Sequence, residues 1–297
     1  MRTLLLLLSA LAAGPLAAQD IADDYLAAQR KMFAARAQFE AERAQHRLDD
    51  GGVPASPGNC RAFRETLFKG KPRAVPDGPG PLDAGLDAFA ADIMRANRLD
   101  IPGLCPAFTV RGDDFAAHSW IDVDPDKPVA GAALAELRRT APRALYVLTG
   151  VIADAPDDGI LAAVLAHELA HLALQHSVDV DVLQWRIERE ARVSPAVMAM
   201  WDASPIPIGG YAPWWREASL RDEEEADLVG AGYLAQAGYR SSDMTRLLGY
   251  LAARSSLDDY WKKRRAALSA ALGAATTPAV SPATPRVSAL RALLNAH

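Results

Sequence analysis

The feature that most constrains this chain is a pair of histidines, His167 and His171, with Glu168 between them. The flanking apolar residues recur at helical spacing, and the many alanines among them favour a helix. Residues four apart on a helix lie one turn above the other, so both imidazoles point to the same side. The sequence therefore predicts a helix with two imidazoles and a carboxylate close together.

That helix face is suited to hold a metal ion. Two histidines four apart can bind one zinc ion, and an open position on zinc lowers the pKa of its bound water to about 7. Glu168 is placed to take the proton of that water. The alternative is a chance spacing on a surface helix. Ala and Leu surround the motif almost all the way round, which favours a buried helix, where ionisable groups need partners.

A zinc ion held by His167 and His171 still needs a third protein ligand. Leu174 and Ser177 stand where the metzincin pattern has Gly and His, so that class is excluded. His176 lies about 140° around the helix from His171. We interpret it as an exposed or capping histidine near the end of the helix.

A second acidic segment offers the missing ligand. Glu223 and Asp227 are one turn apart and lead into an apolar helix. Glu223 is the predicted third ligand, and Asp227 could accept the free N–H of a ligating histidine and fix its tautomer. Gly230 would let this helix approach the first closely. The alternative is a solvated first turn that complements the helix dipole, an interpretation we keep for Asp222, Glu224 and Glu225.

The two motifs together resemble the CAAX prenyl protease and HtpX-like family of zinc metallopeptidases, gluzincins with a His-Glu-x-x-His helix and a Glu-x-x-x-Asp helix. The resemblance covers much of residues 105–297. It implies an α+β, mainly helical fold: a zincin-type metallopeptidase core with a small β-sheet and an active-site helix carrying HExxH. It also implies a zinc endopeptidase with Glu168 as the catalytic base and three metal ligands, His167, His171 and Glu223.

The C-terminal segment resembles the His-Pro…Arg segment of that family. Arg286 matches the family's arginine and is the predicted oxyanion donor, with His118 and Tyr211 as further candidates. Ser281 replaces the family's histidine, so no role is carried over to it. Residues 107–123 are predicted to form the edge strand on the substrate side.

The chain begins like a secretory signal peptide. Arg2 precedes a leucine run, and small residues end at Ala18, the predicted cleavage point. The run is shorter than the roughly 20 residues that span a bilayer. An uncleaved anchor helix is the alternative. The sequence thus predicts export to the periplasm, as in the soluble periplasmic branch of the family, with no transmembrane segment in the mature chain.

Cys60 and Cys105 are the two cysteines of the chain. In an oxidising compartment we expect them to form a disulfide that joins the segment before the catalytic domain to its first strand. Two separate buried thiols are the alternative, because sequence does not give the distance between them.

The predicted organisation is a signal peptide (1–18), an N-terminal helical and linker region (19–104) and a zinc metallopeptidase domain (105–297). Helices are predicted at 21–48, 82–97 and 178–201, with two more beyond Gly238, and an apolar loop at 205–215.

Composition and the resemblance limit the partners. The formal net charge is −5 and no basic stripe is present, which argues against nucleic acid. Unfolded or misassembled envelope proteins are the expected substrates, bound in extended form along a strand edge with little sequence selectivity. The rival hypothesis is a zinc-containing, chaperone-like binding protein with little or no turnover. The sequence does not indicate an oligomeric state.

Overall fold

The computed structural model describes residues 30, 56, 59–63, 80–121, 136, 139–176, 211–255, 258–273 and 285–296. The chain divides into two compact units, and one of them comprises residues 50–124, 132–178 and 220–297. Every side chain discussed below belongs to that unit. The predicted signal peptide and the predicted helix at 178–201 lie outside the described residues, as does the helix at 21–48 apart from Arg30, which is helical.

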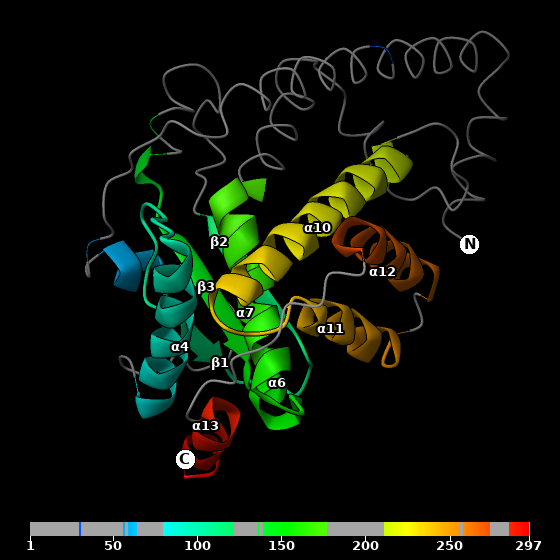
Figure 1. Ribbon diagram of the computed structural model, residues 1–297. Helices are drawn as coiled ribbons and strands as arrows, with labels where there is room; N and C mark the ends of the chain where they lie inside the picture. The colour runs from blue at the N-terminus through cyan, green and yellow to red at the C-terminus, as the bar shows by residue number, and fades with distance from the viewer. Residues whose placement is uncertain are drawn as a thin grey trace, which may run out of the picture. The chain divides into compact units, whose positions relative to one another are not determined.

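This unit contains a small sheet of three strands, which lies among the helices (Figure 1). β3 (Arg143–Leu148) is central, with β1 (Phe108–Val110) parallel to it on one side and β2 (Ala117–Ile121) antiparallel on the other. The prediction of one edge strand over 107–123 is therefore wrong. The segment between β1 and β2 carries Gly and Asp, which favour a turn over a continuous strand.

Two helices cover one face of the sheet. α7 (Asp158–Leu174) packs on β2 and β3, and α4 (Pro81–Asn97) packs on β1 and on α7. The bounds of α4 agree with the predicted helix at 82–97. α4 belongs to the sequence region assigned to the N-terminal segment, and it contributes Leu86, Phe89 and Ile93 to the core.

The opposite face of the sheet is covered by the short helical stretch at 59–63. Cys60 and Phe63 pack there with alternate residues of β3, including Ala144 and Leu148. Cys60 is bonded to Cys105, with their Cα atoms 5.5 Å apart. The predicted disulfide is therefore present in the structure.

The remaining helices follow in chain order: α6 (Thr149–Asp154), α10 (Tyr211–Gln236), α11 (Ser242–Ala252), α12 (Asp258–Leu272) and α13 (Arg286–Asn295). Figure 1 shows α10 crossing α7, while α11 packs on both α7 and α12. α13 packs on α4 and α6.

Two expectations about the C-terminal half need correction. In the described part of the chain, three helices follow Gly238 where two were predicted, because the first ends around Ala253 and α12 packs back on α11. Residues 211–215 begin α10 and are not part of a loop. The fold class is as predicted, mainly helical with a small sheet. Among the described helices, none is both long and apolar enough to cross a bilayer.

Candidate active site

α7 is a buried helix with well-defined ends. The Asp157 carboxylate accepts the backbone N–H of Ile160 at 3.1 Å, and Gln175 ends the helix in a left-handed conformation. Eleven of its seventeen residues are buried, and the side chains of His167 and His171 are each 11% exposed. The interpretation of a chance motif on a surface helix is therefore excluded, and these imidazoles need polar partners.

The three predicted metal ligands converge. The Nε2 atoms of His167 and His171 are 3.0 Å apart. The carboxylate of Glu223, on α10, lies 3.3 Å from His167 Nε2 and 3.5 Å from His171 Nε2. Ligand atoms about 2 Å from a tetrahedral zinc ion are about 3.4 Å from one another. The three side chains thus fit the ligand set of a single zinc ion.

The charges around these residues also call for a cation. Glu168 is 9% exposed and Asp227 is fully buried, and together with Glu223 they make three carboxyl groups. Among the described residues, the guanidinium of Arg264 is the one cation shown to contact these carboxylates. Three possible negative charges against one positive leave a deficit of two, which a divalent cation would neutralise.

The two histidines respond differently to this environment. Burial alone would lower the pKa of His167, but the Asp227 and Glu223 carboxylates outweigh it and raise that pKa to about 10. Burial, followed by the positive charge of His167, lowers the pKa of His171 to about 3. Without a metal, His167 is therefore positively charged near neutral pH and His171 is neutral.

The carboxylates are also shifted. Burial opposes ionisation of Glu223 and Asp227, but His167 and Arg264 lower the pKa of both. Glu168 differs, because burial is the dominant influence and raises its pKa. A ligand has to be ionised and a general base works best with a pKa near neutrality. The shifts suit the predicted roles of Glu223 and Glu168.

Asp227 lies behind the first histidine as predicted. Its Oδ1 atom is 3.1 Å from His167 Nδ1, the ring nitrogen that does not face Glu223. A carboxylate in this place keeps the proton on Nδ1 and leaves Nε2 free to bind a metal.

Arg264 of α12 is a site residue that the sequence analysis missed. Its guanidinium donates two hydrogen bonds of 2.8 Å to Asp227, and its Nη1 atom is 2.7 Å from the Glu223 carboxylate. It is 4% exposed. One signal was available, because Arg264 shares a helical face with the buried Leu268 four residues later.

Gly230 sets the distance between the two helices that carry the predicted ligands. A Cβ atom at this position would lie 3.2 Å from backbone atoms of Ala166, directly before His167, and 2.7 Å from the end of Met244. The predicted close approach of α10 to α7 is confirmed here. The absence of a side chain lets Glu223 reach the histidines.

Glu168 points toward the sheet. Ser119 of β2 hydrogen-bonds its carboxylate, which opposes the pKa rise that burial causes. Ser119 is paired with Leu145 of β3, so both lie on the sheet face that α7 covers. The carboxylate of Glu168, the predicted base, is therefore held beside β2, an edge strand of the described sheet.

The structure does not bring Arg286 to these residues. Its guanidinium pairs with Asp92, and its backbone N–H donates to Asp158 at 2.8 Å, in the first turn of α7. Asp158 precedes His167 by nine residues, or about 13 Å of helix. The prediction of Arg286 as oxyanion donor is therefore wrong. It rested on a short terminal motif, in which the residues from Arg286 onward begin α13.

The other two oxyanion candidates also lie elsewhere or outside the description. The His118 ring lies tilted against Tyr146 with ring centres 5.1 Å apart, on the sheet face opposite to Ser119 and α7. The side chain of Tyr211 lies outside the described residues.

His176 is buried, not exposed as predicted. It is 3% exposed, and its Nδ1 atom is 2.8 Å from Nδ1 of His171. The acidic residues around Glu223 lie in the middle of α10 and not in its first turn, because that helix begins at Tyr211. Asp222 is buried, so the interpretation of a solvated first turn is wrong for it.

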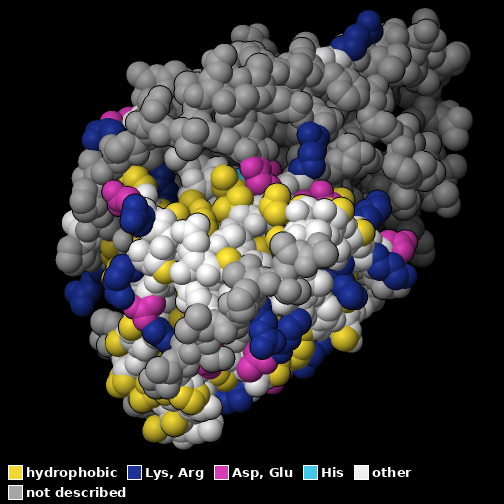
Figure 2. All heavy atoms as spheres, in the orientation of Figure 1, with side chains coloured by type: hydrophobic (Ala, Val, Ile, Leu, Met, Phe, Trp, Pro, Cys, Tyr) yellow, Lys and Arg dark blue, Asp and Glu magenta, His cyan; other side chains and the backbone are white. Residues whose placement is uncertain are grey.

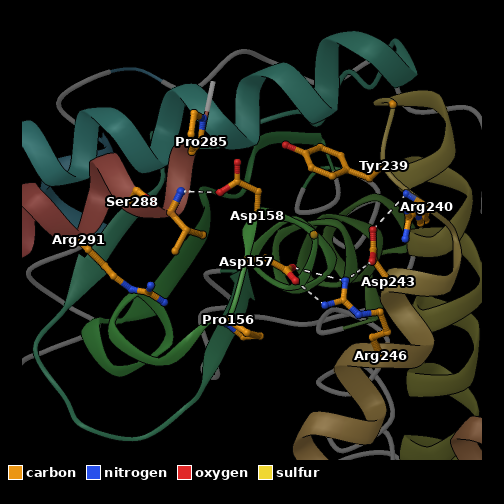
Figure 3. Close-up of a pocket in the computed structure, with 13 residues that line it drawn as sticks. Pro156, Asp157, Asp158, Tyr239, Arg240, Asp243, Arg246, Pro285, Ser288 and Arg291 are labelled. Atoms are coloured by element: carbon orange, nitrogen blue, oxygen red, sulfur yellow. Dashed lines mark hydrogen bonds and ion pairs between the residues drawn. The ribbon is translucent and has the colours of Figure 1, made fainter. Parts of the chain in front are cut away.

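A cavity of about 540 Å³ lies at the other end of α7 (Figure 3). Figure 3 shows Arg246 between Asp157 and Asp243, with which it forms ion pairs. Asp158 accepts the first backbone N–H groups of α13. These contacts join α7, α11 and α13, so the cavity belongs to a structural junction and is separate from the histidine cluster.

The comparison with protein families agrees with this geometry. The sequence profile of peptidase family M48 matches residues 139–294. This stretch is slightly more than half of the chain and contains both motifs. The chain belongs to peptidase family M48. The resemblance to the CAAX prenyl protease and HtpX-like metallopeptidases is thereby confirmed. No curated protein matches the chain.

Proposed function

We propose that this M48 peptidase is an exported, zinc-dependent endopeptidase that cleaves unfolded or misassembled proteins of the cell envelope. The observation that carries the proposal is the convergence of two imidazoles and the Glu223 carboxylate within 3.5 Å of one another, with Glu168 buried beside them. Such a set holds a divalent ion and keeps a base next to it.

The chemistry divides between the ion and the protein. His167, His171 and Glu223 would hold a zinc ion, which would polarise the scissile carbonyl and lower the pKa of a water beside it to about 7. Glu168 takes the proton of the attacking water and passes it to the nitrogen of the leaving amine. Asp227 holds the His167 ring, and Arg264 holds both Asp227 and Glu223 in place.

The position of β2 supports the proposed substrate class. Within the described residues this strand pairs with β3 on one side only, and its Ser119 contacts the catalytic base. An extended peptide that pairs with the outer edge of β2 would pass close to Glu168. Backbone pairing selects for extended chains and little for sequence, which suits unfolded proteins.

Export is supported by the N-terminal sequence and by the cysteines. The disulfide between Cys60 and Cys105 is of a kind that persists in oxidising compartments. Basic and acidic side chains are interspersed over the face drawn in Figure 2, which favours protein over nucleic acid as the partner. Fractionation of cells that express the full chain, with sequencing of the mature N-terminus, tests cleavage after Ala18.

The decisive test of catalysis is Glu168→Gln. This variant should lose cleavage of unfolded casein by a factor of at least about 100 while its zinc content and melting temperature stay close to wild type. Glu224→Gln, which removes a neighbouring carboxylate from the acidic run, should keep the activity. If the wild type is inert and both proteins bind unfolded casein equally, the chaperone-like alternative is correct.

A further inference from the structure

Each metal-facing imidazole has its second ring nitrogen against another buried side chain. His167 Nδ1 faces Asp227 at 3.1 Å, and His171 Nδ1 faces His176 Nδ1 at 2.8 Å. The first arrangement is a carboxylate behind a histidine. In the second, a histidine stands where the carboxylate would be.

We propose that His176 is a positioning residue for the metal ligand His171. It accepts a hydrogen bond from His171 Nδ1–H, and acidic side chains of α10 orient its own ring. This inference rests on the metal site proposed above and deepens it. Neither sequence motif contains His176, which lies one residue beyond the αL end of α7.

The tautomers follow from the positions of the atoms. Nε2 of His171 faces His167 and Glu223, so a neutral His171 that binds metal through Nε2 carries its proton on Nδ1. The only polar atom that His171 Nδ1 is shown to contact is His176 Nδ1 at 2.8 Å, among the described residues. That nitrogen must then be unprotonated, and a neutral His176 carries its proton on Nε2.

The surroundings of His176 Nε2 suit a donor. This atom is buried and lacks a hydrogen bond of normal length. It lies 3.5 Å from the carboxylate of Glu225 and 3.9 Å from that of Asp222, one on each side of Glu223 in the sequence. A proton on Nε2 thus points at negative charge. α10 supplies both a metal ligand and the carboxylates that orient the ring behind another ligand.

A second metal ion is the competing explanation for the same atoms. His176, Asp222 and Glu225 are close enough to hold one. An ion on His176 Nε2 would move that ring's proton to Nδ1, where it would face the Nδ1–H of a metal-bound His171 at 2.8 Å. Two donors cannot share this contact. The His176 cluster therefore orients His171 when the first ion is bound and does not bind a second.

The test compares zinc affinity in His176→Leu and His176→Asn in the full chain, by competition with a chelator. The Asn Oδ1 atom takes the place of His Nδ1 and keeps the acceptor, whereas Leu removes it. His176→Leu should weaken zinc binding about 10–100-fold, and His176→Asn should stay within about threefold of wild type. Unchanged affinity in the Leu variant, or an equal loss in both variants, would overturn the inference.

Wild-type protein gives an independent answer that needs no folded variant. Long-range proton–nitrogen NMR of labelled histidines distinguishes the two neutral tautomers. The chain should bind one zinc ion per molecule, and in the zinc-bound form His176 should carry its proton on Nε2. A second tight equivalent that His176→Asn abolishes, or a proton on Nδ1, contradicts the inference while the proposed peptidase site stands. If wild type binds no zinc at all, the proposed function itself fails.

Discussion

At the scale of single residues, Arg264 explains how so many carboxylates are kept near the histidines. Its guanidinium makes two hydrogen bonds to Asp227 and contacts Glu223, while the side chain is almost fully buried. Removing one partner of a buried ion pair leaves an uncompensated charge, which costs more than the pair contributes. Arg264 is therefore a structural requirement of the site.

Replacing Arg264 by Leu should lower the free energy of unfolding by about 3–5 kcal/mol in the presence of a chelator, because two buried carboxylates lose their cation. Urea unfolding followed by circular dichroism measures this. Arg265→Leu is the matched control, since the neighbouring Arg265 is exposed and its loss should change stability by less than about 0.5 kcal/mol. Equal effects of the two substitutions would contradict the role given to Arg264.

The histidine pKa values predict how the metal-free protein responds to pH. The pKa of His167 rises from 6.5 to about 10 on folding. Its contribution to the free energy of unfolding is therefore complete below pH 6.5 and is lost as the pH rises toward 10. The pKa of His171 falls from 6.5 to about 3, so stability is lost as the pH falls from 6.5 toward 3.

Together these shifts place the stability maximum of the metal-free protein near pH 6.5. Urea midpoints measured with chelator at pH values of about 5, 6.5 and 9 should show lower stability on both sides. His167→Asn should remove the alkaline loss and keep the acid one. A midpoint in the wild type that stays constant from pH 6.5 to 9 would show that His167 does not hold the excess proton.

At the scale of secondary structure, the site depends on the contact between α7 and α10. The i, i+4 spacing places the site residues of each helix on one face of that helix. The distance between α7 and α10 is set at Gly230, which lies against the backbone of Ala166. A side chain there would move α10 away from α7 and carry Glu223 with it.

Gly230→Val should therefore weaken zinc binding at least tenfold, measured by chelator competition, because ligand atoms must stay close to 2 Å from the ion. Gly232→Ala, on the same helix, is the control. A Cβ at Gly232 meets no atom within 4 Å, so this change should leave affinity unaltered and stabilise the helix by up to about 1 kcal/mol. Equal zinc affinities in both variants would mean that α10 has room to shift.

At the scale of the whole molecule, the sheet lies between the candidate active site and the disulfide. α7, which carries His167, Glu168 and His171, packs on one face, and the disulfide between Cys60 and Cys105 lies with the hydrophobic cluster on the other. Stability and catalysis should therefore respond separately to reduction of the disulfide.

The double substitution Cys60→Ser and Cys105→Ser should lower the free energy of unfolding by up to about 4 kcal/mol, since the bond closes a loop of 45 residues. Zinc affinity at 25 °C should stay within about threefold of wild type, because no site residue contacts either cysteine's cluster. Urea unfolding and chelator competition on the same preparation measure both quantities. A loss of zinc binding without unfolding would show that the sheet transmits strain to α7.

The sequence alone determined the parts of this protein that depend on spacing within one helix. His167, Glu168 and His171 share a face because residues four apart always do, and the same geometry relates Glu223 to Asp227. The disulfide followed from there being two cysteines in a chain with a signal-like start. The fold class and the family followed from the two motifs taken together.

Tertiary structure alone decided which residues support those side chains. Arg264, His176 and Ser119 reach the site from α12, from the residue beyond α7 and from β2, and no sequence period connects them to the motifs. The same reason explains the error at Arg286, whose motif is local but whose position depends on the packing of α13. Periodicity fixes the face of an element, whereas the contact between two faces depends on how the helices and the sheet pack.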